Sequence, residues 1–471
     1  MLRFLLAPLS LCFSLLASAA TSNLPSPDFS ALPNGNDSAL VIVDTNSGDT
    51  LFQQRADQLQ PPASIQKMLT ALAAKLYLNN DFQFETTLAQ RGNDIVINFS
   101  GDPTLSRQQL SRLLGQLKKH GITTIKGNIL LNGSQFNGNE QAPGWPWDIL
   151  GVCYSAPSSS LSLEHNCVQG ALYSNQAIGQ LTRVNVPSHQ PITVTTEATI
   201  TDKEKQRDSF CELNLTTQAN NNYLLSGCLA QRDKPLPLNF AVQDTEAYIS
   251  QTIASELKRL GIRHQGKIYR DDTAAGTIIA RHHSATLNDL LNTMIKDSDN
   301  LIADNLTKTL GGRYFNQTGN YANGTAAIKA ILRDKAGINL DNAVLVDGSG
   351  LSRNNRLTAN QIMEVLTYID QHDKTLGLLD ALPVSGESGT LRYRQSIRHQ
   401  PLQGKIQAKS GSLYGTYNLA GLIKTQSGHS LLFVQMITNY HPVEPADDTV
   451  KAPPAIETFE RSLYQTLYNH Y

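Results

Sequence analysis

Residues 61–78, PPASIQKMLTALAAKLYL, join an extended segment to a buried helix and place a serine and a lysine at the junction. Pro61 and Pro62 force the extended segment, because a proline fixes its own φ and restricts the residue before it. Apolar residues then recur at helical spacing and predict one buried stripe: Ile65, Met68, Leu69, Leu72 and Leu76. The pattern puts Ser64 at or next to the helix N-cap, with Lys67 one turn later on the same side.

Strand-like segments lie at both ends of the chain, with helical segments between them. Residues 39–56 predict two extended runs joined by the turn-rich NSGD, and strand-like runs return after residue 403. The last helix places Ile456, Phe459, Leu463 and Leu467 on one face. We expect this face to pack on a sheet, because the opposite face is not basic enough for a membrane surface. The sequence therefore predicts one α/β domain formed by residues 21–82 and 283–471.

Residues 83–282 have a different residue pattern and are predicted to form an insert in that domain. Short strand-like segments are broken by Gly, Asn and Pro, and amphipathic helices are predicted at 106–120 and 245–260. We expect two small β-rich domains, formed by about 83–165 with 241–282 and by about 166–240.

The length and charge of the chain limit the classes of function. A chain of 471 residues is too long for one compact core and should hold several domains. Lys plus Arg (39) nearly cancels Asp plus Glu (40), and no long basic run is present. Nucleic acid is therefore not expected as a partner, because nothing would neutralise its phosphates.

The first 20 residues, MLRFLLAPLSLCFSLLASAA, combine one arginine, an apolar run and small residues. This pattern predicts a secretory signal peptide, cleaved after Ala19 or Ala20. A retained membrane anchor is the alternative, although the run is short beside the roughly 20 residues that a span needs. No other stretch resembles a transmembrane span, so we expect an exported protein in the periplasm.

Four cysteines remain after the signal peptide: Cys153, Cys167, Cys211 and Cys228. An even number in an exported chain predicts disulfides, and three pairings are possible. We favour the local pairs Cys153–Cys167 and Cys211–Cys228, because short loops need no long-range arrangement to close. Zinc binding is the weaker alternative, since no CxxC pair is present and nearby histidines lack ligand spacing. Neither a metal nor another cofactor is expected.

Ser64 and Lys67 form an S-x-x-K pair, which alone is weak evidence. Ser255 and Lys258 match the same pattern inside an amphipathic run, where we expect only a solvated helix face. Ser64 differs because it begins a helix, where unpaired backbone N–H groups can stabilise an oxyanion. A lysine accepts a proton at neutral pH only when burial or a second cation lowers its pKa. The pair therefore requires another lysine elsewhere.

Two further motifs supply the missing groups. KSG, Lys409–Gly411, lies on an extended run, and its glycine would let a substrate backbone approach closely. SDN, Ser298–Asn300, follows a predicted helix, where a loop could present a hydroxyl and an amide. SRN at 352–354 also fits S-x-N, but its turn-rich setting follows no helix. S-x-x-K, S-D-N and K-[ST]-G in this order form the motif set of penicillin-binding proteins and class A β-lactamases.

Lys67 and Ser298 are 231 positions apart, too far for a compact class A β-lactamase. The sequence resembles the low-molecular-mass class C penicillin-binding proteins of the peptidase S13 family over nearly the whole mature chain. Further segments carry the resemblance: GDPTLS (101–106), APGWPWD (142–148), SAPSSSLSLEHNC (155–167), DGSGLSR (347–353) and LPVSGESGTL (382–391). The resemblance implies a split DD-peptidase (β-lactamase/transpeptidase-like) domain, an antiparallel sheet flanked by helices, carrying two small β-rich domains as an insert.

The resemblance also implies catalytic roles. Ser64 would attack the carbonyl of a D-alanyl bond, and Lys67 would take its proton. Ser298 would relay a proton toward the leaving amine. Asn300 would hold the amide of the substrate's side chain, and Lys409 would supply positive field near Lys67 and the terminal carboxylate.

Other residues would bind the substrate. Backbone N–H groups of Ser64 and Ser412 would form the oxyanion hole, and Ser410 keeps the carboxylate-binding hydroxyl where many relatives have threonine. Asp148 is the candidate to recognise the free amino end of a diaminopimelate side chain, with a surface turn carboxylate as the alternative. Arg353 is a candidate substrate contact, with a structural ion pair as the alternative.

The activity so implied is that of a D-alanyl-D-alanine carboxypeptidase and endopeptidase. It would act on peptidoglycan stem peptides and cross-links, use no cofactor and be acylated by β-lactams. Loose association with membrane or wall complexes is possible in such enzymes. A β-lactamase, which needs fast deacylation, and a catalytically silent peptidoglycan-binding scaffold are the alternatives.

Overall fold

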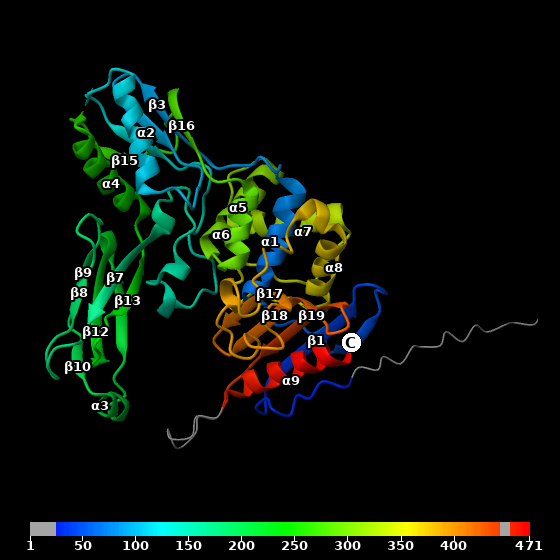
Figure 1. Cartoon of the computed structure of the whole chain (residues 1–471). Helices are drawn as coiled ribbons and strands as arrows, with labels where there is room; N and C mark the ends of the chain where they lie inside the picture. Colours follow the sequence, from blue (N-terminus) through cyan, green and yellow to red (C-terminus); the bar gives the residue numbers. More distant parts are fainter. Residues whose placement is uncertain (1–24, 443–452) are drawn as a thin grey trace, which may run out of the picture.

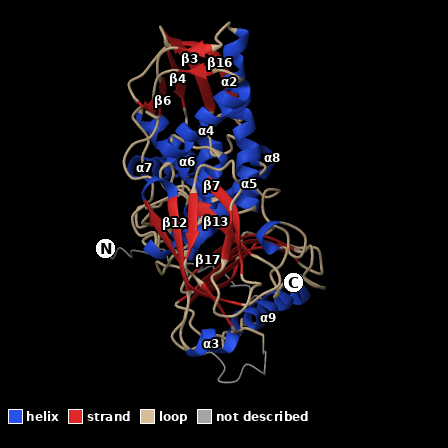
Figure 2. Ribbon diagram, turned by 90° about the vertical axis from the view of Figure 1, so that its left-hand side faces the viewer, coloured by secondary structure: helices blue, strands red, loops and turns tan. Residues whose placement is uncertain are grey.

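The computed structural model describes residues 25–442 and 453–471 (Figure 1). The predicted signal peptide, residues 1–20, lies outside the described residues. Within the part that is described, no helix is both long and apolar enough to cross a membrane. The molecule is elongated, and one end is formed by the sheet that contains β3 (Glu85–Arg91), β4 (Asp94–Asn98), β6 (Ile129–Asn132) and β16 (Thr277–His283) (Figure 2).

A five-stranded antiparallel sheet joins the two ends of the chain. Its strands lie in the order β17-β18-β19-β1-β2. They are β1 (Asp37–Asp44), β2 (Thr50–Gln54), β17 (Ile406–Leu413), β18 (Thr416–Lys424) and β19 (Ser430–Thr438). Because β1 pairs with both β2 and β19, the N-terminal hairpin becomes part of the C-terminal sheet. The predicted antiparallel sheet, split in sequence, is confirmed.

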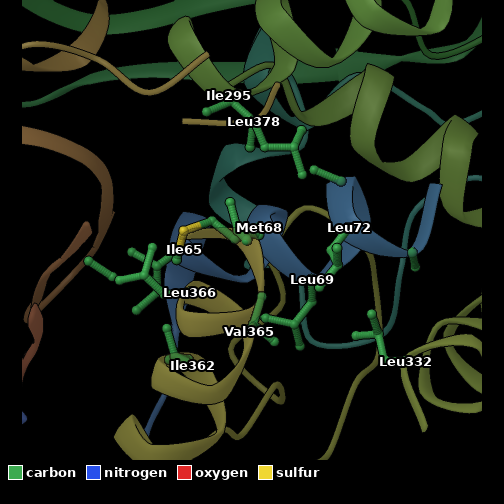
Figure 3. Packing of buried hydrophobic residues seen from close by; sticks show 14 of the residues in the cluster. Ile65, Met68, Leu69, Leu72, Ile295, Leu332, Ile362, Val365, Leu366 and Leu378 are labelled. Atoms are coloured by element: carbon green, nitrogen blue, oxygen red, sulfur yellow. The ribbon is translucent and has the colours of Figure 1, made fainter. Parts of the chain in front are cut away.

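Helices cover both faces of this sheet, as its alternating side chains require. Val41 of β1 packs with the helices of one face, and Ile42 packs toward the other. The first face carries α1 (Lys67–Tyr77), α5 (Leu287–Lys296), α6 (Asn300–Phe315), α7 (Tyr321–Ala336) and α8 (Ala359–Leu376). Figure 3 shows Ile65, Met68 and Leu69 of the predicted stripe packed with residues of α8, namely Ile362, Val365 and Leu366. The second face carries α9 (Ala455–His470), whose four predicted apolar residues are buried there (Figure 1).

The inserted segment begins with a second five-stranded sheet, in the order β15-β6-β4-β3-β16. The elements are β3 (Glu85–Arg91), β4 (Asp94–Asn98), β6 (Ile129–Asn132), β15 (Ile268–Arg270) and β16 (Thr277–His283), with α2 (Arg107–Lys119) and α4 (Thr245–Leu260). A short pair, β5 (Thr124–Ile125) and β14 (Arg263–His264), lies beside it. The two helices predicted in this segment are thus confirmed.

Smaller sheets follow in the middle of the insert. One has the order β13-β7-β8, and the other joins β9, β10 and β11 to β12. Their bounds are β7 (Cys167–Tyr173), β8 (Arg183–Asn185), β9 (Thr193–Thr196), β10 (Thr199–Thr201), β11 (Leu213–Gln218), β12 (Asn222–Ala230) and β13 (Leu236–Ala241), with α3 (Lys203–Asp208). The domain boundaries given above stay a prediction.

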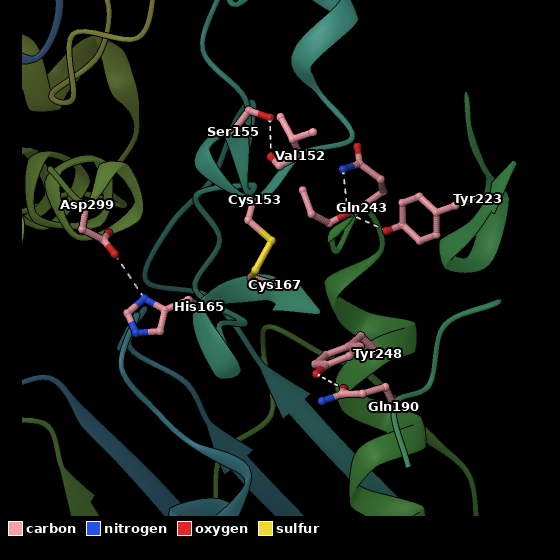
Figure 4. Close-up of a disulfide and its surroundings, with 11 residues drawn as sticks. Val152, Cys153, Ser155, His165, Cys167, Gln190, Tyr223, Gln243, Tyr248 and Asp299 are labelled. Carbon is pink, nitrogen blue, oxygen red and sulfur yellow. Dashed lines mark hydrogen bonds and ion pairs between the residues drawn. A yellow bond between two sulfur atoms is a disulfide. The ribbon is translucent and has the colours of Figure 1, made fainter. Parts of the chain in front are cut away.

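Both predicted disulfides are present, Cys153–Cys167 and Cys211–Cys228. The first lies where the insert meets the helices of the large domain, close to His165 and Asp299 (Figure 4). The second fastens the segment after α3 to β12. In residues 25–442 and 453–471, no group of three or more His, Cys, Asp or Glu side chains is placed to hold a metal ion.

Candidate active site

Ser64 lies in a short 3-10 helix, Ala63–Gln66, that runs directly into α1. Two glycines, Gly350 and Gly411, allow their own segments to pack closely against this turn. A Cβ on Gly350, whose φ is +80°, would lie 2.0 Å from the carbonyl oxygen of Ala63, and one on Gly411 would lie 2.8 Å from that of Pro62. At Gly411 the close approach is to another segment of the chain itself, and the approach of a substrate backbone there stays a prediction.

The Lys67 side chain is fully buried beneath Ser64. Its Nζ lies 3.0 Å from Ser64 Oγ, and it donates to Asn300 Oδ1 at 2.6 Å and to the Ser349 carbonyl at 2.6 Å. A neutral amine has two N–H groups and one lone pair. Asn300 and Ser349 can accept both N–H groups, because a carbonyl oxygen has no proton to give. The lone pair is then left for the Ser64 hydroxyl, which is the arrangement of a nucleophile and its base.

Burial is the main cause of the lowered pKa of Lys67. It lowers the pKa of Lys67 to about 8, against the opposing field of Asp304 and Asp347. Burial also lowers the pKa of Lys409, and the charge of Lys67 lowers that pKa further. The sequence left burial and a second cation open as causes. In the structure desolvation dominates, and repulsion between the two lysines acts on Lys409.

Lys409 lies on β17 and is hydrogen-bonded to the second predicted catalytic serine, Ser298. Its Nζ donates to Ser298 Oγ at 2.9 Å and to the Ser410 carbonyl at 2.9 Å. Ser298 lies between α5 and α6 with a left-handed backbone, φ +62°, so this turn fixes where its hydroxyl points. The three motifs therefore converge, and each lysine holds one serine hydroxyl.

Asn300 is the first residue of α6 and connects Lys67 with the insert. Besides accepting from Lys67, its amide donates through Nδ2 to the Tyr154 carbonyl at 2.6 Å. Tyr154 belongs to a short 3-10 helix, Cys153–Ser155, and its side chain is 54% exposed. The insert thus contributes backbone to the active site, which sequence reasoning did not foresee.

A histidine and a carboxylate reinforce this contact. His165 Nδ1 lies 3.3 Å from Asp299 Oδ2, and Asp299 caps α6 by accepting from the N–H of Ile302 (Figure 4). The hydrogen bond to Asp299 raises the pKa of His165. The Cys153–Cys167 disulfide ties the Tyr154 segment to the strand that follows His165, so both contacts to α6 are fastened together.

Two buried carboxyl groups, also missed, organise the loop that carries Ser349. Asp304 Oδ1 accepts from the N–H groups of Gly348 and Ser349 at 2.9 and 3.0 Å. Asp347 accepts from the N–H of Gly350 at 2.9 Å. Burial, and then the field of Asp347, raises the pKa of Asp304 to about 8. A sequence signal existed, because Asp304 follows Asn300 by four positions and therefore shares its helix face.

The remaining predicted residues differ in exposure, because Ser410 is buried and the other three are exposed. Ser410 Oγ donates to Thr390 Oγ1 at 2.7 Å, and Ser412 is exposed on β17. Asp148 is exposed, and its field adds to burial in raising the pKa of Tyr154. It therefore lies on the Tyr154 side of the site.

Arg353 is also exposed, and its guanidinium carbon lies 5.8 Å from the centre of the Tyr414 ring. It forms no ion pair within the described residues, so the structural ion pair considered above is not found.

The competing motif matches have ordinary structural roles. Ser255 and Lys258 are exposed on α4, as expected, and Ser255 Oγ accepts from Arg107 at 3.0 Å. Ser352 is buried and donates through Oγ to the Pro143 carbonyl at 2.7 Å.

Comparison with known proteins agrees with this geometry. The profile of the D-Ala-D-Ala carboxypeptidase 3 (S13) family matches residues 28–460. A D-alanyl-D-alanine carboxypeptidase, DacB, of Haemophilus influenzae is 37% identical over 448 residues, which cover 93% of this chain and 92% of that protein. A D-alanyl-D-alanine carboxypeptidase of Actinomadura is 26% identical and covers 91% of this chain and 82% of its own length.

Solved structures show the same fold. The crystal structure of penicillin binding protein 4 (dacB) from H. influenzae superposes with a TM-score of 0.87 at 36% identity, covering 93% of this chain and 98% of that one. The same protein complexed with a β-lactam gives a TM-score of 0.82 at 35% identity, with the same coverage. With the serine and lysine motifs assembled around Ser64, these matches place the chain in the peptidase S13 family, as a serine D-Ala-D-Ala carboxypeptidase.

Proposed function

We propose that this enzyme removes the terminal D-Ala from peptidoglycan stem peptides and also cuts D-Ala–diaminopimelate cross-links, both through a Ser64 acyl-enzyme. One observation carries the proposal. Lys67 Nζ lies 3.0 Å from Ser64 Oγ, while Asn300 and Ser349 offer acceptors for its two N–H groups. A buried amine held in this way is suited to take the hydroxyl proton at neutral pH.

In acylation, Ser64 Oγ attacks the carbonyl carbon of the D-alanyl bond, and its proton passes to Lys67 Nζ. Backbone N–H groups of Ser64 and Ser412 stabilise the oxyanion. When the C–N bond breaks, Ser298 gives its proton to the leaving amine and regains one from Lys67, which is then neutral again. In deacylation, Lys67 takes a proton from the water that attacks the ester. When the Ser64 Oγ–carbon bond breaks, Lys67 returns this proton to Ser64 Oγ, and the shortened peptide is released.

The same steps serve carboxypeptidase and endopeptidase cleavage, because only the leaving amine differs. A cross-linked substrate needs room beyond the scissile bond. The exposure of two tyrosines supports such access, since Tyr154 is 54% exposed and Tyr414 is 78% exposed. Asp148, beside Tyr154, would accept from the free amino group of diaminopimelate. Ser410 would bind the terminal carboxylate of a stem peptide.

A β-lactam would follow the acylation path and stop there, because its amine leaving group stays attached. The β-lactam complex of the H. influenzae protein supports this proposal for Ser64. The substrate places the enzyme at the cell wall, so we propose a periplasmic location, in agreement with the export signal predicted from residues 1–20. The domain division predicted above, with an insert at 83–282, belongs to the same proposal.

The test is to incubate purified enzyme with cross-linked muropeptides and to follow the products by mass. We expect loss of one D-Ala from pentapeptides and conversion of cross-linked dimers to monomers. Ser64→Ala should abolish both reactions, whereas Ser255→Ala, at the competing motif, should retain both. Release of D-Ala without cleavage of dimers would refute the endopeptidase part. Rapid turnover of penicillin without a persistent Ser64 adduct would indicate a β-lactamase instead.

A further inference from the structure

A cleft of about 850 Å³ lies away from the catalytic serine, between the second five-stranded sheet and the C-terminal half of α6. One wall comes from β3, β4 and the loop after β6. The other comes from α6 and the turn that follows it, residues 316–318. Its position makes the cleft a junction between the insert and the catalytic domain.

The walls of this cleft carry polar groups that the protein leaves unused. Among the described residues, no hydrogen bond partner is found for the guanidinium of Arg313 or for the side chains of Gln135, Gln317 and Thr318. Ser100 Oγ, also in the wall, is buried without a partner. Because a buried hydroxyl without a partner is costly, a bound molecule or water is needed there.

Aromatic rings form the apolar part of the lining. Phe82 and Phe136 are each 6% exposed, and the Arg313 guanidinium lies 4.6 Å from the centre of the Phe82 ring. Stacking on an aromatic face holds the planar guanidinium in one orientation. Glu85, the acidic residue of the lining, is already paired with Arg281. The groups without a partner are therefore one guanidinium, two side-chain amides and two hydroxyls. They lie beside the aromatic rings that form the apolar part of the cleft.

This chemistry fits a ligand rich in hydroxyl and amide groups that also has apolar faces. Amide side chains donate and accept at once, as N-acetyl groups do, and arginine donates to carbonyl and hydroxyl oxygens. We propose that the cleft binds the glycan strand of peptidoglycan, a polymer of N-acetylated amino sugars. The proposal rests on the proposed function, which places this polymer beside the enzyme.

The position of the cleft relative to Ser64 supports this role. Asn300 begins α6 in the active site, and Arg313 lies thirteen residues further along the same helix. At about 1.5 Å of rise per residue, the two are about 20 Å apart. One polymer can then occupy both sites, with a peptide at Ser64 and its own or a neighbouring strand in the cleft. Binding at two linked points raises the affinity for the polymer but not for a free peptide.

The test uses Ser64→Ala protein, so that binding is measured without cleavage, and glycan strands from which the peptides have been removed. The double variant Gln135→Ala/Gln317→Ala removes two exposed side chains without partners and should leave folding intact. Arg313→Glu reverses the central charge. We expect each to weaken binding about tenfold or more, the loss typical of removing hydrogen bonds to a charged or multiply bonded group. Arg112→Glu, an exposed α2 arginine outside the cleft, is the matched control.

A second measurement separates this proposal from the catalytic one. With Ser64 restored, the cleft variants should release D-Ala from a soluble stem peptide at the parent rate and from intact sacculi more slowly. Unchanged strand binding in both variants would overturn the glycan site, as would losses confined to free peptide. If the parent itself fails to release D-Ala from the soluble peptide, the proposed function fails, while strand binding still reports on the cleft.

Discussion

Lys409 Nζ donates a hydrogen bond to Ser298 Oγ at 2.9 Å, whereas Ser64 Oγ is hydrogen-bonded to Lys67. Each lysine is therefore hydrogen-bonded to a different serine. In the mechanism proposed above, Lys67 is the base for the nucleophile, and Lys409 holds the serine that gives its proton to the leaving amine. This division predicts different consequences for changes at each lysine and at the groups around them.

Lys67→Arg should nearly abolish acylation. A guanidinium cannot lose its proton in a protein, so the variant keeps the positive charge but lacks a base. We expect acylation to slow by about 10³-fold, within the range usual for general bases. The measurement is the rate at which a fluorescent penicillin labels the protein. Lys258→Arg, the same change at the competing motif, should label at the parent rate. A loss of less than tenfold in Lys67→Arg would show that another group accepts the proton.

The pH dependence of acylation should reflect Lys67. The base works when neutral, so kcat/KM should rise with pH as the pKa near 8 is passed. Asp304→Asn keeps an oxygen for the N–H groups of Gly348 and Ser349. It removes a carboxyl group whose pKa is also about 8, so its negative charge forms over the same pH range and there favours protonated Lys67. The kcat/KM of the Asp304→Asn variant should therefore rise at a lower pH than that of the parent. Asp334→Asn, an exposed carboxylate on α7, should leave the midpoint in place. A midpoint that Asp304→Asn leaves unchanged contradicts this coupling.

Gly350→Ala should damage the active site more than the fold. Its Cβ would lie 2.0 Å from the Ala63 carbonyl, so the turn that holds Ser64 must move. Gly48 has a similar left-handed φ, +76°, but a Cβ added there would meet no atom within 4 Å. Both alanine variants should lose about 1 kcal/mol from backbone strain. Penicillin acylation should fall at least tenfold in Gly350→Ala alone. Equal rates in the two variants would show that the site tolerates the displacement.

The two disulfides offer a matched pair of deletions. They close loops of similar length, with separations of 14 and 17 residues, so each loss should cost about 3 kcal/mol of unfolding free energy. Only Cys153–Cys167 adjoins Tyr154, whose carbonyl holds Asn300. Replacing Cys153 and Cys167 by serine should therefore also lower kcat/KM for a soluble stem peptide. The Cys211 and Cys228 double variant should keep the parent kcat/KM below its unfolding temperature, and a similar loss in both would contradict the link to Asn300.

Local patterns predicted the core of the site. The proline break, the apolar stripe and the S-x-x-K spacing all lie within one short stretch, so Ser64 and Lys67 could be paired from the sequence. The disulfides were predictable for the same reason, because each closes a short loop. Lys409 could be assigned to the site only through the order of the motifs, since nothing local ties β17 to α1.

What the sequence did not predict depends on contacts between distant segments. Asn300 and Tyr154 meet across 146 positions, and a local pattern cannot report that the insert folds back onto α6. Gly411 illustrates a second limit, because a glycine signals a close approach without showing which backbone approaches. The buried Asp304 was hidden in an ordinary helical run, and its importance depends on the loop that packs over it.

Because β1 pairs with β19 across 401 positions, the catalytic sheet cannot be complete before residue 438 has been made. Ser64 and Lys67 precede most of these positions, whereas Lys409 lies on β17, in the later half of the sheet. A product truncated before residue 406 lacks β17, β18 and β19, so Ser298 has no lysine partner and α1 has no complete sheet to pack on. The split sheet therefore makes assembly of the active site depend on synthesis of both of its halves.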